Sequence, residues 1–210
     1  MAAERMRELI GKEVLGGYIE RGEYEQAKAA IIKSCGGSFR VSPTTRQSNN
    51  LLNQWDMRVL LDAAAQPLVE RLYDLLYGDG PFAQRFDAWV DVLATEKKPG
   101  VWQGATYFLM LHDPDAYIFI KPTQFGFFLK NTGLDQAWPV RPDSAMYLRF
   151  LAAARQLLSS LASLGARDMI DTQSFIWTVH YYAERLAWIF QSNPDYYDLP
   201  GALNELDEID

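Results

Sequence analysis

The stretch LVERLYDLLYGDGPFAQRFDAWVDVL, residues 68–93, decides the fold class of this chain. Its apolar residues recur every three or four positions on both sides of the Gly-Asp-Gly-Pro sequence at 78–81. That spacing is typical of amphipathic helices, and a glycine–proline cluster between two such runs ends one helix and begins the next. The stretch therefore predicts two helices, over about 54–77 and 82–94.

The same spacing dominates most of the remaining chain and predicts further helices over 3–15, 23–34, 101–111, 123–131, 144–164 and 172–190. The segment Ala116 to Ile120 is the exception, because it is short, apolar and partly β-branched, which favours a short strand or an extended segment. We therefore expect an all-α protein of about seven or eight helices.

Particular residues are expected at helix ends and in the core. Helix N-caps are predicted at Asp143 or Ser144, at Asp171 and at Thr123. In the last helix Phe175 and Ile176 are expected to point inward. The tryptophans are also expected in the core: Trp89, Trp102 and Trp177.

The pattern also predicts how the chain is organised. Residues 1–37 are predicted to form an N-terminal helical hairpin, a candidate subdomain, and 38–53 a polar, basic loop rich in hydroxyl and amide side chains. Residues 54–190 are predicted to form the main helical domain, and 191–210 an acidic tail.

Composition excludes several classes of protein. With 49% apolar residues among 210 the chain can bury a full core and is not a disordered polymer. Its one cysteine, Cys35, permits no intramolecular disulfide, which fits a reducing compartment. The N-terminal stretch MAAERMRELIGKEV lacks the apolar region of a secretory signal, and no segment is long and apolar enough to span a membrane. We expect a cytoplasmic protein with no membrane partner.

Charge is distributed unevenly along the chain. The formal net charge is -7, but six acids and no base lie in the tail, so the first 194 residues carry only -1. Between Lys28 and Trp55 there are four bases and no acid. A basic segment of this kind is what contact with nucleic-acid phosphates needs. The alternative interpretation is an ordinary solvated loop. The candidate residues for contact with nucleic acid are Lys28, Lys33, Arg40, Arg46, Lys121 and Lys130.

Familiar catalytic motifs are missing from the sequence. There is no GxxxxGK[ST], GxGxxG or HExxH motif, and two histidines with one cysteine cannot form a usual structural zinc site. We therefore expect no cofactor, no metal and no catalytic residue, and a non-catalytic protein rather than an enzyme. One alternative is a metal-dependent nuclease site at Asp113, Asp115 and Lys121. The simpler interpretation of these residues is a turn that ends a helix.

Three strings carry a resemblance to a known family: LLYGDGPFAQRFDAWVDVL (75–93), ATYFLMLHDPDAYIFIKPTQFGFFLKNTGL (105–134) and LGARDMIDTQSFIWTV (164–179). The most distinctive parts are D-P-x-x-Y-x-F-I-K-P-T at 113–123 and R-D-M-I-D-x-Q-S-F-I-W at 167–177. Over roughly residues 50–180 the chain resembles a helical region of McrB-like AAA+ ATPases. These are the motor subunits of modification-dependent restriction systems and related defence proteins.

The resemblance implies a function by analogy. In such proteins an N-terminal region precedes the motor and recognises the target, typically modified DNA, while the motor recruits a nuclease. This chain has no Walker motif, so the resemblance implies the recognition region or a stand-alone relative rather than the motor, and no catalytic residue is carried over.

We therefore expect a recognition or adaptor domain of a restriction or antiviral defence system. It would bind DNA, with an AAA+ motor or nuclease subunit as a further partner. Two alternatives remain: a protein–protein interaction module that uses the acidic tail, and an acidic inhibitor of a DNA-binding enzyme.

Overall fold

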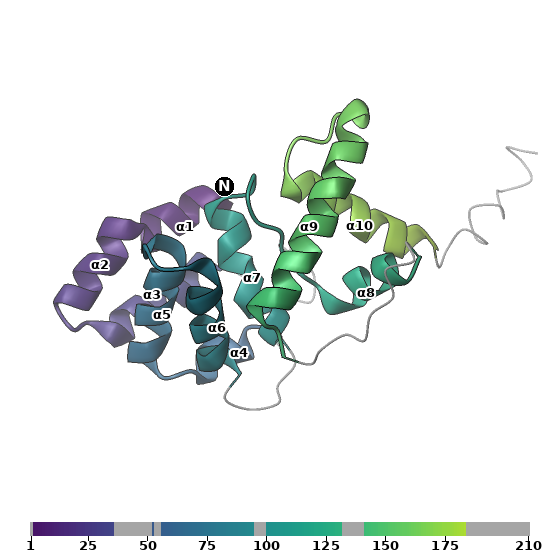
Figure 1. Ribbon diagram of the computed structural model, residues 1–210. Helices are drawn as coiled ribbons and strands as arrows, with labels where there is room; N and C mark the ends of the chain where they lie inside the picture. Colours follow the sequence, from purple (N-terminus) through teal and green to yellow (C-terminus); the bar gives the residue numbers. More distant parts are fainter. Residues whose placement is uncertain (1, 36–51, 53–55, 95–99, 132–140, 184–210) are drawn as a thin grey trace, which may run out of the picture.

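A computed structural model describes residues 2–35, 52, 56–94, 100–131 and 141–183 (Figure 1). Within these ranges the regular structure is helical and no β-strand occurs, so the predicted all-α class is confirmed. The helices are α1 (Ala2–Ile10), α2 (Lys12–Glu20), α3 (Tyr24–Ser34), α4 (Arg58–Asp62), α5 (Ala65–Tyr77), α6 (Phe82–Leu93), α7 (Val101–His112), α8 (Pro122–Asn131), α9 (Ser144–Leu161), the 3-10 helix η1 (Ala162–Leu164) and α10 (Met169–Ala183).

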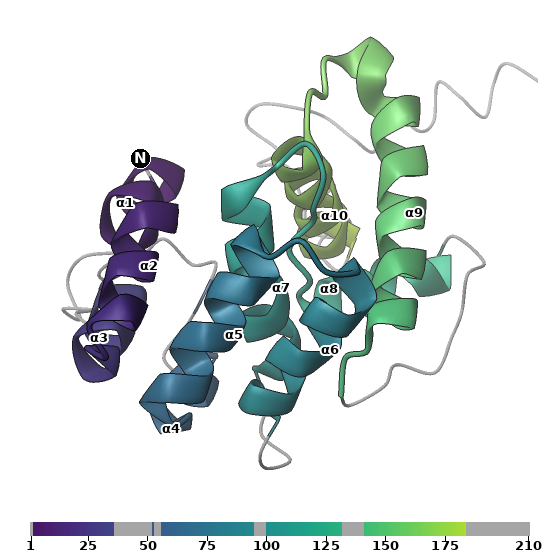
Figure 2. The same ribbon diagram turned by 60° about the vertical axis from the view of Figure 1, so that its left-hand side comes forward.

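Helices α5, α6 and α7 form the centre of the molecule, with α1–α3 packed on one side and α8–α10 on the other (Figures 1 and 2). The inward faces of α5 and α6 carry the apolar residues of the deciding stretch, including Leu72, Phe86 and Trp89, all fully buried. Helix α7 is buried on nearly every side, as expected for a helix that is apolar all round.

The stretch predicted as one helix over 3–15 forms two helices, α1 and α2, which separate at Gly11. The backbone of Gly11 is extended there, with ψ 164°. A Cβ at this position would lie 2.5 Å from the carbonyl oxygen of Arg7, so only glycine allows this sharp change of direction. The bend lets Ile10 and Leu15 both reach the core, where neither is exposed to solvent.

The predicted helix over 54–77 is also divided, into α4 and α5, by extended backbone at Ala63 and Ala64. Pro67 accounts for the break locally, because it has no amide hydrogen and its ring clashes with a helical carbonyl four residues earlier, at Ala63. A tertiary interaction then binds the freed carbonyls. The Nζ of Lys28 on α3 donates hydrogen bonds to the carbonyl oxygens of Leu61 (2.7 Å) and Ala63 (2.6 Å). These hydrogen bonds satisfy carbonyls at the end of α4, where helices leave acceptors without an intrahelical partner.

Residues 114–116 form a turn after α7, and residues 117–120 continue to α8 without forming a helix or a strand. The carbonyls of Pro114, Ala116 and Ile118 accept hydrogen bonds from neighbouring elements, and the amide of Ile120 donates one. Their partners are the Met169 amide (2.9 Å), Arg155 Nη2 (3.2 Å), the Tyr147 hydroxyl (3.1 Å) and Thr106 Oγ1 (2.9 Å). The segment is therefore fixed by α7, α9 and the start of α10 rather than by a sheet.

Two helix ends near this segment differ from the prediction. Asp168, not Asp171, caps α10, since its Oδ1 accepts from the amides of Ile170 (2.9 Å) and Asp171 (3.0 Å). The helix consequently starts at Met169, and the described part ends at Ala183. Helix α8 begins at Pro122, so Thr123 lies inside it.

The predicted cap of α9 is confirmed at Asp143, which accepts from the amide of Met146 at 2.7 Å. Among the described residues, no helix combines the length and apolarity that a membrane crossing requires.

We predict that Tyr147→Phe lowers the free energy of unfolding by about 1–3 kcal/mol, because the buried Ile118 carbonyl would lose its donor. Urea denaturation measures this change. Tyr182→Phe is the matched control, since it removes a hydroxyl from an exposed ring and should change stability by less than about 0.5 kcal/mol. Equal effects of the two substitutions would contradict the role given to Tyr147.

A second prediction concerns Cys35 at the end of α3. Burial raises the pKa of its thiol to about 12, whereas an unfolded cysteine ionises near pH 8.5. The thiol therefore contributes its full stabilisation below about pH 8.5 and loses about 2 kcal/mol of it by pH 10. In urea titrations at pH 7 and pH 10, the stability difference between the wild type and Cys35→Ala should shrink by that amount. A difference that does not change with pH would contradict this prediction.

Candidate functional site

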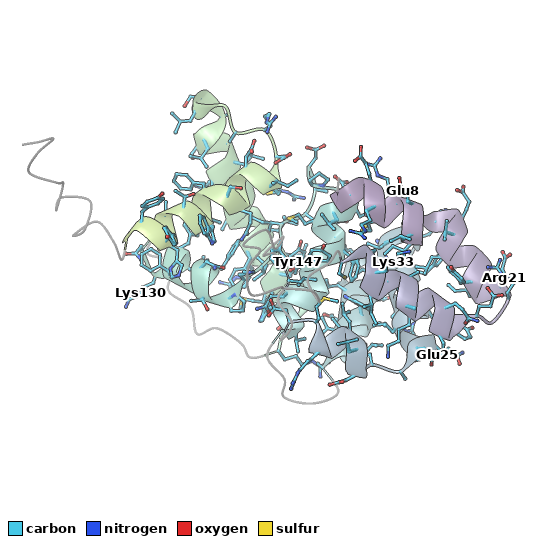
Figure 3. All side chains as sticks on the ribbon, turned by 180° about the vertical axis from the view of Figure 1, so that it is seen from behind. Glu8, Arg21, Glu25, Lys33, Lys130 and Tyr147 are labelled. Atoms are coloured by element: carbon cyan, nitrogen blue, oxygen red, sulfur yellow. The ribbon has the colours of Figure 1, made fainter. Side chains whose placement is uncertain are left out.

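The basic residues predicted to contact phosphates are spread over the molecule. Lys33 is exposed on α3 and Lys130 is exposed at the end of α8, on opposite sides of the central helices (Figure 3). Arg40 and Arg46 lie outside the described residues. The structure therefore does not bring the described members of this set together on one face.

Lys28 and Lys121 have interactions within the fold. Lys28 holds the end of α4 through two carbonyls, as described above. Lys121 is half-buried, and burial lowers its pKa while the neighbouring Asp56 carboxylate opposes that shift. Gly100, with φ 97°, allows the backbone of Asp56 to approach the start of α7, where a Cβ would lie only 2.8 Å from the Cα of Asp56.

The alternative nuclease residues serve a turn in this structure. Asp113 Oδ1 accepts hydrogen bonds from the amides of Asp115 and Ala116, both at 3.1 Å. This is the local bonding by which aspartate stabilises turns. In the described part of the chain no group of three or more histidine, cysteine, aspartate or glutamate side chains is placed to hold a metal ion.

The outer side of α10 is the unusual surface of the molecule. The structure describes eight large apolar side chains that are exposed, and five of them belong to η1 and α10: Leu164, Ile170, Phe175, Trp177 and Tyr182. Single exposed apolar residues are ordinary, but such a concentration marks an interaction site. We call these five residues, together with Tyr181, the α10 face.

Aromatic rings dominate the C-terminal part of the α10 face. The rings of Trp177 and Tyr181, one helical turn apart, stack with centroids 5.0 Å apart and planes 14° from parallel. Tyr182 packs edge-on against Tyr181 at 5.2 Å. Trp177 and Tyr182 are each 46% exposed, so the cluster offers flat apolar surface to a ligand.

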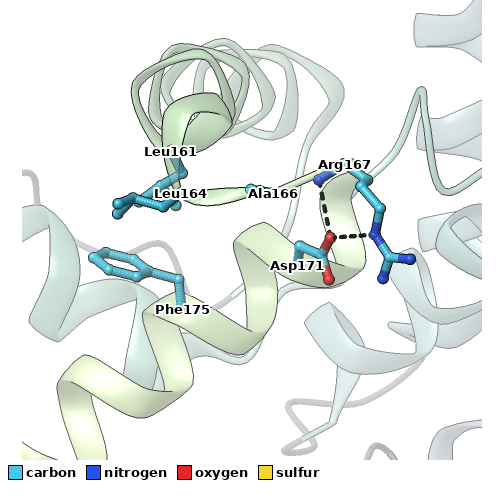
Figure 4. A pocket seen from close by; sticks show the side chains of 7 residues that line it. Leu161, Leu164, Ala166, Arg167, Asp171 and Phe175 are labelled. Carbon is cyan, nitrogen blue, oxygen red and sulfur yellow. Dashed lines mark hydrogen bonds and ion pairs between the residues drawn. The ribbon is translucent and has the colours of Figure 1, made fainter.

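The N-terminal part of the α10 face borders an open hollow of about 510 Å³. Leu161 and Leu164 lie opposite Phe175 across it (Figure 4). At its edge the Asp171 carboxylate accepts from the Arg167 backbone amide (2.9 Å) and from Arg167 Nε (3.1 Å). This hydrogen bonding raises the pKa of Arg167 and lowers that of Asp171, so both groups are charged at neutral pH.

The layer formed by α8, α9 and α10 has exposed cations. Helices α8 and α9 contain three bases, Lys130, Arg149 and Arg155, and no acid. All three are exposed, and none forms an ion pair with a carboxylate that the structure describes. Lys130 lies near the C-terminal end of α10 (Figure 3), and Arg167 precedes its first turn. The α10 face is thus flanked by a cation at each end.

Helices α8 and α10 carry buried polar atoms without partners. Within the described residues, Gln124 Oε1 on α8 and Gln173 Oε1 and His180 Nδ1 on α10 are buried and accept no hydrogen bond. The ring of His180 lies edge-on to Phe127 at 5.2 Å. Bound water commonly satisfies such buried atoms.

Comparison with known proteins adds no assignment: no family model, curated protein or solved structure shows significant similarity to the chain. The resemblance to McrB-like ATPases therefore stays a prediction.

The sequence interpretation missed the α10 face because it assigned Phe175 and Trp177 to the core. Both are exposed, whereas Ile176 between them is fully buried as expected. A signal was present, since the apolar residues of 169–183 are spread around the helix rather than gathered on one face, and a helix at the surface cannot bury every side.

We predict that Lys28→Met destabilises the protein by about 1–3 kcal/mol, because two carbonyls at the end of α4 would lose their donor. The matched control, Lys33→Met on the same helix, removes an exposed charge and should cost less than about 0.5 kcal/mol. Thermal or urea unfolding compares the two. A neutral Lys28→Met would show that this lysine is not structural and would restore it as a candidate phosphate contact.

Proposed function

We propose that this chain is a recognition module, without chemistry of its own, that binds nucleic acid through the outer side of the α8–α10 layer. The observation that carries the proposal is the exposed aromatic cluster of the α10 face, stacked and flanked by Arg167 and Lys130. Proteins that bind single-stranded or unstacked nucleic acid combine these two features. Aromatic rings stack on bases and cations contact the phosphates.

The distribution of charge favours the α8–α10 layer as the nucleic-acid-binding surface over the basic segment at 28–55. Residues 116–183 hold six bases and four acids, a net charge of +2. Three of those acids have partners inside the protein: Asp143 and Asp168 cap helices, and Asp171 pairs with Arg167. The exposed cations of α8 and α9 therefore have little local competition for phosphate.

We further propose that the module belongs to a modification-dependent restriction or antiviral defence system, with an AAA+ motor or a nuclease subunit as its partner. This part rests on the two distinctive strings, at 113–123 and 167–177. Their backbones meet, because the Met169 amide donates to the Pro114 carbonyl at 2.9 Å. Both strings thus belong to one structural unit, the unit that presents the α10 face.

A second candidate function is protein recognition. The apolar character of Leu164, Ile170 and Phe175 beside an open hollow favours it, since such patches also mark protein interfaces. The two candidates differ in one measurable property. Nucleic-acid binding through phosphate contacts weakens steeply with salt, whereas apolar protein contacts do not.

We predict that the protein binds a fluorescent single-stranded oligonucleotide more tightly than the matching duplex at low salt. A modification-dependent reader binds methylated duplex more tightly than unmethylated duplex. Trp177→Ala should weaken binding by about 1–3 kcal/mol through lost stacking, a factor of roughly 5 to 150. Lys130→Ala should reduce the steepness of log affinity against log salt concentration by about one, the loss of one phosphate contact.

Arg21→Ala is the matched control for these variants. Arg21 is exposed at the far end of the molecule, on the α1–α3 side (Figure 3), so its removal should leave affinity unchanged. If neither single strand nor either duplex binds at low salt, the nucleic-acid proposal fails and protein recognition becomes the better candidate.

A further inference from the structure

The α10 face leaves a large aromatic surface in contact with water, and the chain itself contains a segment that fits it. We infer that residues 195–210 dock on the α10 face and compete there with other ligands. The docking is argued from α10 and the sequence alone. Only the competition with nucleic acid rests on the proposed function.

The chemistry of the two partners is complementary. Residues 195–210 contain six acids and no base, together with six large apolar residues: Tyr196, Tyr197, Leu199, Leu203, Leu206 and Ile209. Three of these, Leu203, Leu206 and Ile209, recur at every third position among the acids, so apolar and acidic side chains alternate along the segment. The α10 face offers aromatic rings between two cations, Arg167 and Lys130.

The pairing of Arg167 leaves it able to bind a further carboxylate. Asp171 engages only its Nε and its backbone amide, so both terminal guanidinium nitrogens remain available for a second acceptor. The side chain is 81% exposed. A guanidinium binds carboxylates through a planar pair of hydrogen bonds, which suits the acids of the segment.

The chain is long enough for this docking. Eleven residues, 184–194, separate Ala183 from the segment, and an extended chain of that length spans about 36 Å. Helix α10 has 15 residues and is about 22 Å long. The segment can therefore reach either end of the α10 face, and residues 191–195 (Gln-Ser-Asn-Pro-Asp) are typical of a turn.

Tethering favours this occupant over a free partner. A short flexible linker gives an effective concentration in the millimolar range, so even a contact with millimolar affinity is substantially occupied. A second copy of the chain offers no such advantage. Two α10 faces placed together would also bring like-charged flanking residues near one another.

The test is hydroxyl-radical footprinting of the full-length protein, read by mass spectrometry at Trp177 and Tyr182. One variant neutralises acids of the segment (Glu205→Gln, Asp207→Asn and Glu208→Gln), and a second removes its apolar contacts (Leu203→Ser and Leu206→Ser). In both we expect labelling of Trp177 to rise about two- to tenfold, as for the release of a segment that covers the face half to nine-tenths of the time. Labelling of Tyr18 on α2 is the internal reference and should stay constant.

The matched control variant, Glu8→Gln with Glu20→Gln and Glu25→Gln, changes the net charge equally but on α1–α3, where Glu8 and Glu25 are seen in Figure 3. It should leave labelling of Trp177 unchanged. Unchanged labelling in both tail variants would overturn the inference, and so would an equal rise at Tyr18. Labelling of the wild type that changes on tenfold dilution would assign the contact to a second copy and overturn intramolecular docking.

A separate arm distinguishes this inference from the proposed function. The affinity of the acid-neutralised variant for the single-stranded oligonucleotide should rise by the same factor as the labelling. If labelling rises and neither protein binds the oligonucleotide, the docking stands and the nucleic-acid proposal fails. If binding is seen with unchanged labelling, the proposed function stands and the docking fails.

Discussion

The backbone polar groups of residues 114–120 impose the constraint on which the C-terminal half of the fold depends. This segment begins with a turn, in which the amides of Ala116 and Tyr117 donate to the Asp113 carbonyl, and it continues with Ile118, Phe119 and Ile120 fully buried. No helix or sheet pairs its remaining amides and carbonyls. Each buried polar group left unpaired would cost about 1–3 kcal/mol. The described structure supplies partners from α7, α9 and α10, and these hydrogen bonds set where the three helices lie relative to one another.

The position of α10 follows from this constraint, and the candidate function follows from the position. The Met169 amide bonds to the segment, so the helix starts against it, and its inner side, with Ile176, packs on α8 and α9. Helix α10 packs mainly on α8 and α9 among the described helices, which leaves its other side facing outward. Trp177 and its neighbours therefore face solvent, where they are available to a ligand or to the chain's own acidic segment.

Local patterns in the sequence predicted most of the helices, while the differences arose at single glycine and proline positions and from tertiary contacts. The deciding stretch at 68–93 forms α5 and α6 as expected, because periodicity and the Gly-Pro break both act locally. The break between α4 and α5 lies four residues before Pro67, a local signal that the apolar periodicity obscured, and the carbonyls of Leu61 and Ala63 at the break are bound by Lys28, more than thirty residues earlier. The cap at Asp168 was missed because Asp171 competes for the same role and is instead taken by Arg167. The α10 face was missed because Phe175 and Trp177 were assigned to the core on their apolar character alone.

The central claim is that the α8–α10 layer presents the binding surface of this protein, and amide hydrogen exchange tests it most directly. Exchange is measured on the full chain with and without a saturating single-stranded oligonucleotide. The account predicts slower exchange at the end of α8 and along α10, with no change in α1–α3. Protection confined to α1–α3, or no protection anywhere at low salt, would contradict it.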